Sequence, residues 1–241
     1  MKTIVGGLSA AYDIKGRKGG KFLVILHAWS KGLDRKKYQV LINLLSERYR
    51  IISFDFPGFG GSSFPPRPWT VDDYTDFTAS FLDKLKIGVC LLLGHSFGGR
   101  VAIKLASRYP ERVAGLILVD SAGIERKSFK VKTVIAISER IPLFLKRFFR
   151  PVIGSKDFRE AGGVMRETLK LVVAEDLEEE IKSIKKKTLI VWGEEDRTTP
   201  LWQGRLIHRL IKGSELVVIS NANHGLPWKN PKELAKKIFN F

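Results

Sequence analysis

The sequence predicts an α/β fold, a mostly parallel, doubly wound sheet whose strands alternate with helices. Short runs of almost continuous apolar character are typical of strands buried on both faces of a parallel sheet. These runs span residues 22–26, 51–54, 89–93, 115–119, 188–192 and 216–219. Longer amphipathic stretches between them are expected to form helices, at residues 36–48, 71–86, 100–109, 201–211 and 231–239. Strands and helices that alternate in this way indicate a doubly wound sheet.

The first residues of the chain predict an antiparallel entrance to this sheet. Residues 3–14 and 21–26 both have strand character, and a glycine-rich segment, residues 16–20, joins them. Two strands joined by a short glycine-rich segment are typical of a hairpin. We therefore expect residues 3–14 to pair with residues 21–26.

The alternation stops in the middle of the chain, where about sixty residues carry no strand pattern. Pro142 and Pro151 break this region into helical pieces, since proline interrupts a helix. Its first half is both basic and rich in phenylalanine. We expect residues 124–185 to form a helical cap, or lid, inserted into a core made of residues 1–123 and 186–241.

Composition narrows the class of protein. The 241 residues include 42 basic and 25 acidic ones, a net charge of +17 that attracts nucleic acid, anionic membranes or acidic substrates. The basic residues are spread along the chain without a nucleic-acid motif, so no nucleic-acid partner is expected, and solubility explains the charge better than membrane contact does. No apolar run reaches the ~18 residues of a membrane-spanning helix. Residues 4–11 fit a first strand better than a secretory signal, which favours a cytoplasmic protein.

The segment of residues 91–99, LLLGHSFGG, carries the strongest functional signal. An apolar strand runs into the pattern G-x-S-x-G, and a helix follows, which is the context of a nucleophile elbow. Gly94 and Gly98 supply the small neighbours that such a sharp turn requires. We therefore expect Ser96 to be a nucleophile held at a helix N-terminus, where backbone N–H groups favour developing negative charge.

A serine nucleophile needs a base, and the base needs an acid to orient it. His224 follows the apolar run at residues 216–219, whereas His208 falls inside a predicted helix, so His224 is the better candidate for the base. Asp196 follows another strand and is the favoured acid. Asp120, at the end of a third strand, is its rival. Glu194 and Glu195 are lesser rivals.

Five segments together resemble the α/β-hydrolase superfamily, and the resemblance covers nearly the whole chain apart from the predicted cap. The segments are residues 27–30, 55–62, 94–99, 193–200 and 223–224. The resemblance implies an eight-stranded α/β-hydrolase fold and a catalytic triad of Ser96, Asp196 and His224. It also implies an oxyanion hole made by the backbone N–H groups of Phe97 and Trp29, and no cofactor. The four scattered histidines, with no CxxC or HExxH motif, likewise predict no metal site.

One position departs from the family pattern. The family usually has His-Gly where this chain has His27-Ala28. An alanine at position 28 adds little backbone strain if its φ is negative, and much more if its φ is positive. His27 and His95 flank the machinery and are expected to hydrogen-bond and hold the two loops rather than to catalyse.

The expected activity is hydrolysis of a small-molecule carboxylic ester, lactone or thioester through an acyl-enzyme on Ser96. Residues nominated for the substrate pocket are Ala28, His95, Phe144, Phe148 and Trp228. Serine as nucleophile argues against the dehalogenases and epoxide hydrolases of the superfamily, which use aspartate. Hydrolysis of a carbon–carbon bond in a vinylogous diketone ranks second, because residues 27–33 lack the Gly-x-Gly-Pro-Gly loop of those enzymes. A non-catalytic binding or membrane-surface protein on the same fold is the alternative of another class.

Overall fold

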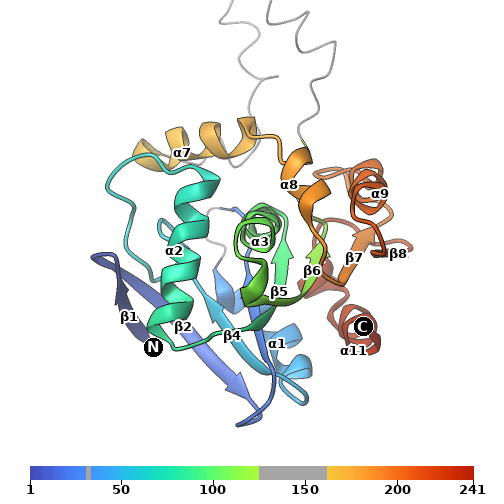
Figure 1. Ribbon diagram of the computed structural model, residues 1–241, viewed down its shortest axis with the longest axis horizontal. Helices are drawn as coiled ribbons and strands as arrows, with labels where there is room; N and C mark the ends of the chain where they lie inside the picture. Colours follow the sequence, from blue (N-terminus) through green and yellow to red (C-terminus); the bar gives the residue numbers. More distant parts are fainter. Residues whose placement is uncertain (31–33, 125–161) are drawn as a thin grey trace, which may run out of the picture.

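The computed structural model describes residues 1–30, 34–124 and 162–241, and these contain an eight-stranded, mostly parallel sheet (Figure 1). The strands are β1 (Lys2–Val5), β2 (Leu8–Gly16), β3 (Phe22–Leu26), β4 (Arg50–Phe54), β5 (Cys90–His95), β6 (Val113–Val119), β7 (Thr188–Gly193) and β8 (Glu215–Ile219). Their order across the sheet is β1-β2-β4-β3-β5-β6-β7-β8. All neighbours from β4 to β8 pair in parallel, so the predicted fold class is confirmed.

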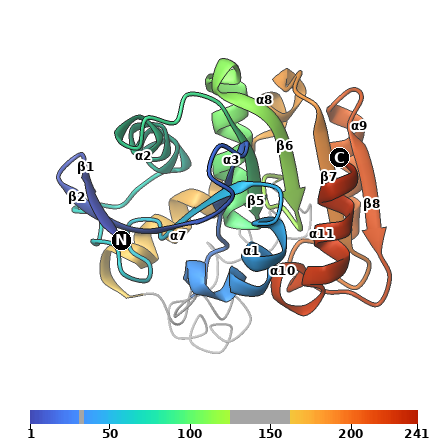
Figure 2. The same cartoon turned by 90° about the horizontal axis from the view of Figure 1, so that it is seen from below.

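Helices cover both faces of this sheet. The α-helices are α1 (Gln39–Leu45), α2 (Val71–Lys84), α3 (Phe97–Arg108), α7 (Gly163–Ala174), α8 (Glu178–Ser183), α9 (Leu201–Leu210), α10 (Leu226–Lys229) and α11 (Pro231–Asn240). Two 3-10 helices, η1 (Arg35–Tyr38) and η2 (Pro110–Arg112), precede α1 and β6. Figure 2 looks onto the face that α1, α10 and α11 cover. No helix among the described residues is long and apolar enough to traverse a bilayer.

The hairpin predicted between residues 3–14 and 21–26 was wrong. Instead, β1 and β2 form the hairpin, and the chain turns at Gly6 and Gly7, whose φ angles are 54° and 81°. A two-residue turn with two positive φ angles matches the twist of a hairpin, and glycine adopts it without strain. β2 then pairs antiparallel with β4, so the glycine-rich residues 16–20 carry the chain past β4 to β3.

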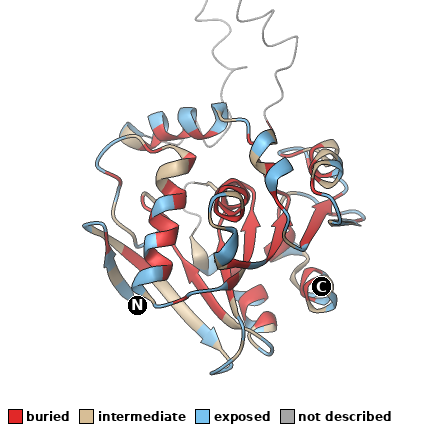
Figure 3. Cartoon of the chain, in the orientation of Figure 1, coloured by how far each residue is buried: buried red, intermediate tan, exposed pale blue. Residues whose placement is uncertain are grey.

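Most residues of the central strands are buried (Figure 3). Their side chains alternate between the two faces of the sheet and build one hydrophobic cluster on each face. Val24 and Leu26 of β3 contribute to the cluster beneath α2, α3 and α9. Leu23 and Ile25 contribute to the cluster beneath α1, α10 and α11. The central strands are therefore buried on both sides, as their continuous apolar sequences indicate.

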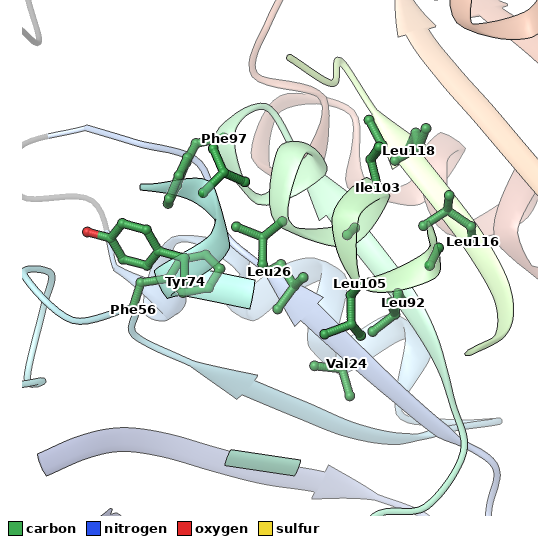
Figure 4. Packing of buried hydrophobic residues seen from close by; sticks show 14 of the residues in the cluster. Val24, Leu26, Phe56, Tyr74, Leu92, Phe97, Ile103, Leu105, Leu116 and Leu118 are labelled. Atoms are coloured by element: carbon green, nitrogen blue, oxygen red, sulfur yellow. The ribbon is translucent and has the colours of Figure 1, made fainter. Parts of the chain in front are cut away.

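Helix α3 begins at Phe97, three residues earlier than predicted, and packs directly on the sheet (Figure 4). The sequence pattern places Gly98 and Gly99 at the end of the turn, but both belong to the helix. A Cβ on Gly98 would collide with the backbone of Leu26, and one on Gly99 with Ser121. The two glycines therefore allow the helix to approach the strands closely.

Residues 125–161 of the predicted cap lie outside the described residues, whereas α7 and α8 belong to its described part. These helices contact the core through specific polar groups. Thr168 Oγ1 accepts a hydrogen bond from the backbone N–H of Trp69 at 3.0 Å. The nearly buried Lys104 forms ion pairs with Asp72 and Glu175. The chain that leaves the insertion is thus anchored to α2 and α3.

Candidate active site

The segment after β5 turns sharply into α3 at Ser96, which has φ 52° and ψ −114°. Residues other than glycine rarely adopt a positive φ, so the surrounding structure must hold this bend. The backbone N–H of Gly99 donates to Ser96 O at 2.9 Å. The close contact of Gly98 with Leu26 and His27 leaves the helix no room to shift. The bend projects Ser96 Oγ beyond the carboxyl end of the strand.

Three polar side chains from three loops form one hydrogen-bonded chain. Ser96 Oγ lies 2.9 Å from His224 Nε2, and His224 Nδ1 lies 2.7 Å from Asp196 Oδ2. Since the carboxylate accepts the Nδ1 proton, Nε2 is free to accept the proton of Ser96. His224 follows β8, Asp196 follows β7, and Ser96 follows β5. The parallel strands bring these loops together at one edge of the sheet.

The Asp196 carboxylate is fully buried and is held at both oxygens. Oδ1 accepts the backbone N–H groups of Thr198 and Thr199 at 2.7 and 2.9 Å. Oδ2 accepts the hydroxyl of Thr199 at 2.8 Å. Glu194 and Glu195, the lesser rivals, are exposed. Four donors, counting the imidazole of His224, therefore fix the carboxylate that faces the base.

Asp120, the other rival, lies beside this carboxylate at the end of β6. Its Oδ1 accepts the backbone N–H of Gly193 at 2.8 Å. Its Oδ2 has no hydrogen-bond partner of ordinary geometry among the described residues, although the Asp196 carboxyl and the Leu226 backbone are close to Asp120. Burial, together with repulsion from Asp196, raises the pKa of Asp120 to about 8. At neutral pH Asp120 is therefore mostly protonated.

Ligand atoms of His95, Asp120 and His224 lie within 4.8 Å of one another, a spacing compatible with a metal ion. The ring nitrogens of both histidines are, however, within hydrogen-bond distance of protein atoms. The cluster is therefore better described as a hydrogen-bonded network than as a metal centre.

The two amides expected to form the oxyanion hole belong to Phe97, the residue after Ser96, and to Trp29, in the loop after β3. The N–H of Phe97 is the first of helix α3, where no intrahelical acceptor exists. In the other loop, the N–H of Ala28 already donates to Tyr38 Oη at 2.9 Å, so the next amide, that of Trp29, is the candidate. The Trp29 ring packs edge-on against Phe97, with ring centroids 5.3 Å apart. Ala28 is not among the residues with positive φ, so the departure from His-Gly imposes no backbone strain.

His27 joins the loops that follow β3 and β4. Its Nε2 accepts the backbone N–H of Phe56 at 3.0 Å, and its Nδ1 lies 2.7 Å from Ala28 O. Burial lowers the pKa of His27, which keeps the ring neutral as this pattern requires. The ring also contacts Phe56 and Phe59. His27 thus fixes the start of the loop that carries Trp29.

The structure gives His95 a different position from the pocket wall that the sequence suggested. Its ring is fully buried, and both nitrogens lie within hydrogen-bond distance of protein atoms, Tyr38 Oη at 2.7 Å and His224 O at 2.9 Å. Trp228 is partly buried and packs edge-on against His95, with centroids 5.2 Å apart. Phe144 and Phe148 lie outside the described residues.

Sequence reasoning missed two residues that contact the site. Thr199 Oγ1 lies 2.8 Å from Asp196 Oδ2 and 3.2 Å from His224 Nδ1. Its place in the loop after β7 was a signal that could have found it. Tyr38 belongs to a short 3-10 helix, and no motif marked it.

Several known proteins resemble this chain over most of its length. A model of the Alpha/beta hydrolase family matches residues 23–237. The uncharacterized hydrolase YugF of Bacillus subtilis is 26% identical in an alignment that covers 98% of this chain and 95% of the relative. A 2-hydroxy-6-oxononadienedioate/2-hydroxy-6-oxononatrienedioate hydrolase of Escherichia coli is 27% identical in an alignment that covers 93% of this chain and 88% of the relative.

Solved structures share the fold. The enol-lactonase of Burkholderia xenovorans superposes with a TM-score of 0.77 at 22% identity, and the match covers all of this chain and 98% of that one. The family match spans most of the chain, including the segments that carry Ser96, Asp196 and His224. The chain therefore belongs to the alpha/beta hydrolase family.

Proposed function

We propose that this hydrolase cleaves carboxylic esters, including cyclic esters, through an acyl-enzyme formed on Ser96. The observation that supports it most directly is the hydrogen-bonded chain from Ser96 Oγ through His224 to Asp196, with contacts of 2.9 and 2.7 Å. A nucleophile, a base and an orienting acid in this order are the requirements of serine acyl transfer. The serine also lies at the N-terminus of α3, where the helix dipole favours an oxyanion.

The reaction begins when Ser96 Oγ attacks the ester carbonyl carbon and His224 Nε2 takes the hydroxyl proton. The tetrahedral oxyanion accepts hydrogen bonds from the N–H groups of Phe97 and Trp29, and one such donor is worth roughly 3–4 kcal/mol of barrier. His224 gives its proton to the leaving alcohol as the acyl-enzyme forms. Water then attacks the acyl carbon, His224 removes its proton, and the acid leaves as Ser96 is restored. Asp196 holds the imidazole in the required tautomer throughout.

Turnover of p-nitrophenyl acetate and p-nitrophenyl butyrate tests this proposal. The Ser96→Ala variant is expected to lose ~10³-fold or more in kcat. A fluorophosphonate probe is expected to label the wild-type chain and not the variant. Equal turnover by the two proteins would refute the assignment of Ser96, and no turnover by either would favour a binding protein on a hydrolase fold.

A second candidate is hydrolysis of a carbon–carbon bond in a vinylogous diketone. The similarity to the dienedioate hydrolase of Escherichia coli favours it, whereas the missing Gly-x-Gly-Pro-Gly loop at residues 27–33 disfavours it. The two substrate classes are separated by measuring kcat/KM for an ester, a lactone and a vinylogous diketone with the same enzyme preparation. If kcat/KM for the diketone exceeds the values for both the ester and the lactone, the second candidate replaces the first.

A further inference from the structure

A buried line of hydrogen bonds crosses the site behind the triad. The backbone N–H of Ala28 donates to Tyr38 Oη at 2.9 Å, and Tyr38 Oη lies 2.7 Å from His95 Nδ1. His95 Nε2 lies 2.9 Å from the backbone oxygen of His224. Tyr38 and His95 are both 0% exposed. The line therefore runs from the loop that carries Trp29 to the backbone of the proposed base, out of reach of solvent.

The direction of every hydrogen bond in this line is fixed by its ends. Ala28 contributes an N–H, which can only donate, so Tyr38 Oη accepts there and directs its own proton to His95 Nδ1. His95 Nδ1 is then the acceptor, and the proton of the neutral ring lies on Nε2. At the other end the carbonyl of His224 can only accept, which matches a protonated Nε2. The two ends impose the same tautomer on His95.

The surroundings of His95 favour this neutral ring. Burial, the nearby imidazole of His224 and that of His27 all lower its pKa, while the hydrogen bond to the His224 carbonyl opposes them. The ring of Trp228 packs edge-on against both Tyr38 and His95, with centroids 5.8 and 5.2 Å away. Aromatic packing thus holds the two rings in the orientation that their hydrogen bonds require.

We infer that Tyr38 and His95 are positioning residues, which together form a relay that sets the His224 backbone at a fixed distance from the oxyanion loop. The inference rests on the proposed function, because His224 and Trp29 matter to one another only if a tetrahedral intermediate forms between them. His95 is also the residue directly before Ser96, so the relay ties nucleophile, base and oxyanion loop to one rigid unit. Geometry of this kind acts on kcat rather than on substrate binding.

Three substitutions each remove a different part of the relay. His95→Gln places an amide NH₂ where Nε2 lies and keeps a donor for the His224 carbonyl. His95→Asn places an oxygen where Nδ1 lies, keeps the acceptor for Tyr38 and releases His224. Tyr38→Phe removes the hydroxyl that serves both Ala28 and His95. Tyr74→Phe is the matched control, since Tyr74 is equally buried and its hydroxyl donates one hydrogen bond, to Pro57 O at 3.1 Å.

The kinetic arm measures kcat and KM for p-nitrophenyl butyrate at 25 °C, with the melting temperature of each variant recorded alongside. His95→Asn, which removes one hydrogen bond, is expected to lower kcat ~10-fold, and Tyr38→Phe, which removes two, is expected to lower it at least as much; KM is expected to change less than about twofold in both. His95→Gln, which keeps a donor for the His224 carbonyl but loses the acceptor for Tyr38, is expected to lower kcat by less than either of these two variants. If kcat for Tyr38→Phe equals that for Tyr74→Phe at comparable melting temperatures, the positioning role is overturned.

A second arm does not depend on turnover. In ¹⁵N-histidine-labelled protein, His95 is expected to keep the proton on Nε2 between pH 6 and 8, and its Nδ1 resonance is expected to shift in Tyr38→Phe but not in Tyr74→Phe. A proton found on Nδ1, or an unchanged resonance in Tyr38→Phe, overturns the relay. If Ser96→Ala is as active as wild type, the proposed function has failed, and the tautomer still decides whether the relay exists.

Discussion

Replacing Asp120 with asparagine tests the charge state of the carboxyl pair behind His224. The structure raises the pKa of Asp120 from 3.8 to about 8, chiefly through burial. Asparagine has nearly the same shape and keeps an acceptor for the N–H of Gly193. The substitution therefore removes one titration and leaves the contacts in place.

The sign of the effect follows from proton linkage. Between about pH 4 and pH 8 the folded wild type holds a proton on Asp120 that the unfolded chain has released, so rising pH favours unfolding. Each rise of one pH unit lowers the free energy of unfolding of the wild type by at most ~1.4 kcal/mol. From pH 5 to pH 8 this amounts to an upper limit of about 4 kcal/mol. An asparagine side chain cannot ionise, so the Asp120→Asn variant is expected to gain stability relative to wild type by that amount as the pH rises.

Urea unfolding, followed by tryptophan fluorescence at pH 5, 6, 7, 8 and 9, measures the free energy of unfolding of both proteins. The difference between them isolates Asp120, because the other titrating groups are shared. Asp83→Asn is the control for loss of a carboxylate, since the Asp83 side chain is 67% exposed. A difference for Asp120→Asn that stays constant from pH 5 to pH 8 would refute the reasoning.

Further outcomes follow from other contacts. Thr199→Val, which removes a hydroxyl bonded to the proposed acid at 2.8 Å, is expected to lower kcat ~10-fold; an unchanged kcat in steady-state assays contradicts this. Gly98→Ala forces a Cβ into backbone, whereas Gly88→Ala meets open space, so only the former is expected to lower the melting temperature markedly, and equal melting temperatures count against it. Burial lowers the pKa values of His27 and His95, so the unfolded chain alone gains these protons below pH 6.5. In the Asp120→Asn variant, where the opposing carboxyl titration is absent, the free energy of unfolding is expected to fall as the pH drops below 6.5; urea midpoints that do not move refute it.

Local signals predicted much of the fold. Continuous apolar runs identified the buried strands, because a strand covered on both faces needs no polar side. The hairpin was placed wrongly because a glycine-rich segment marks a turn without saying which strands it joins. Gly6 and Gly7 close the hairpin, while residues 16–20 span a neighbouring strand. Pairing order depends on contacts across the whole sheet, which no short window contains.

Some residues of the candidate site could likewise be predicted from the sequence, and others could not. Ser96 is marked by its own neighbours, since the sharp bend requires small residues at fixed offsets. Asp196 and Asp120 were both candidates for the acid, because each follows a strand and the two strands, β7 and β6, are adjacent in the sheet. Only the hydrogen bond to His224 Nδ1 distinguishes them. Tyr38 reaches His95 from 57 residues away, and a contact of that kind leaves no trace in spacing or periodicity.

The position of β5 in the strand order predicts how the effects of substitutions on its two sides combine. On one side of β5, β3 leads to the amide proposed to polarise the carbonyl; on the other, β7 and β8 lead to the groups proposed to move the proton. Substitutions confined to one flank change one half of the chemistry, and changes made on opposite flanks are expected to multiply independently in rate. Substitutions of residues that connect the two flanks, such as Tyr38, are expected to combine non-additively. In laboratory evolution of a new specificity, positions away from these residues are expected to tolerate the most changes.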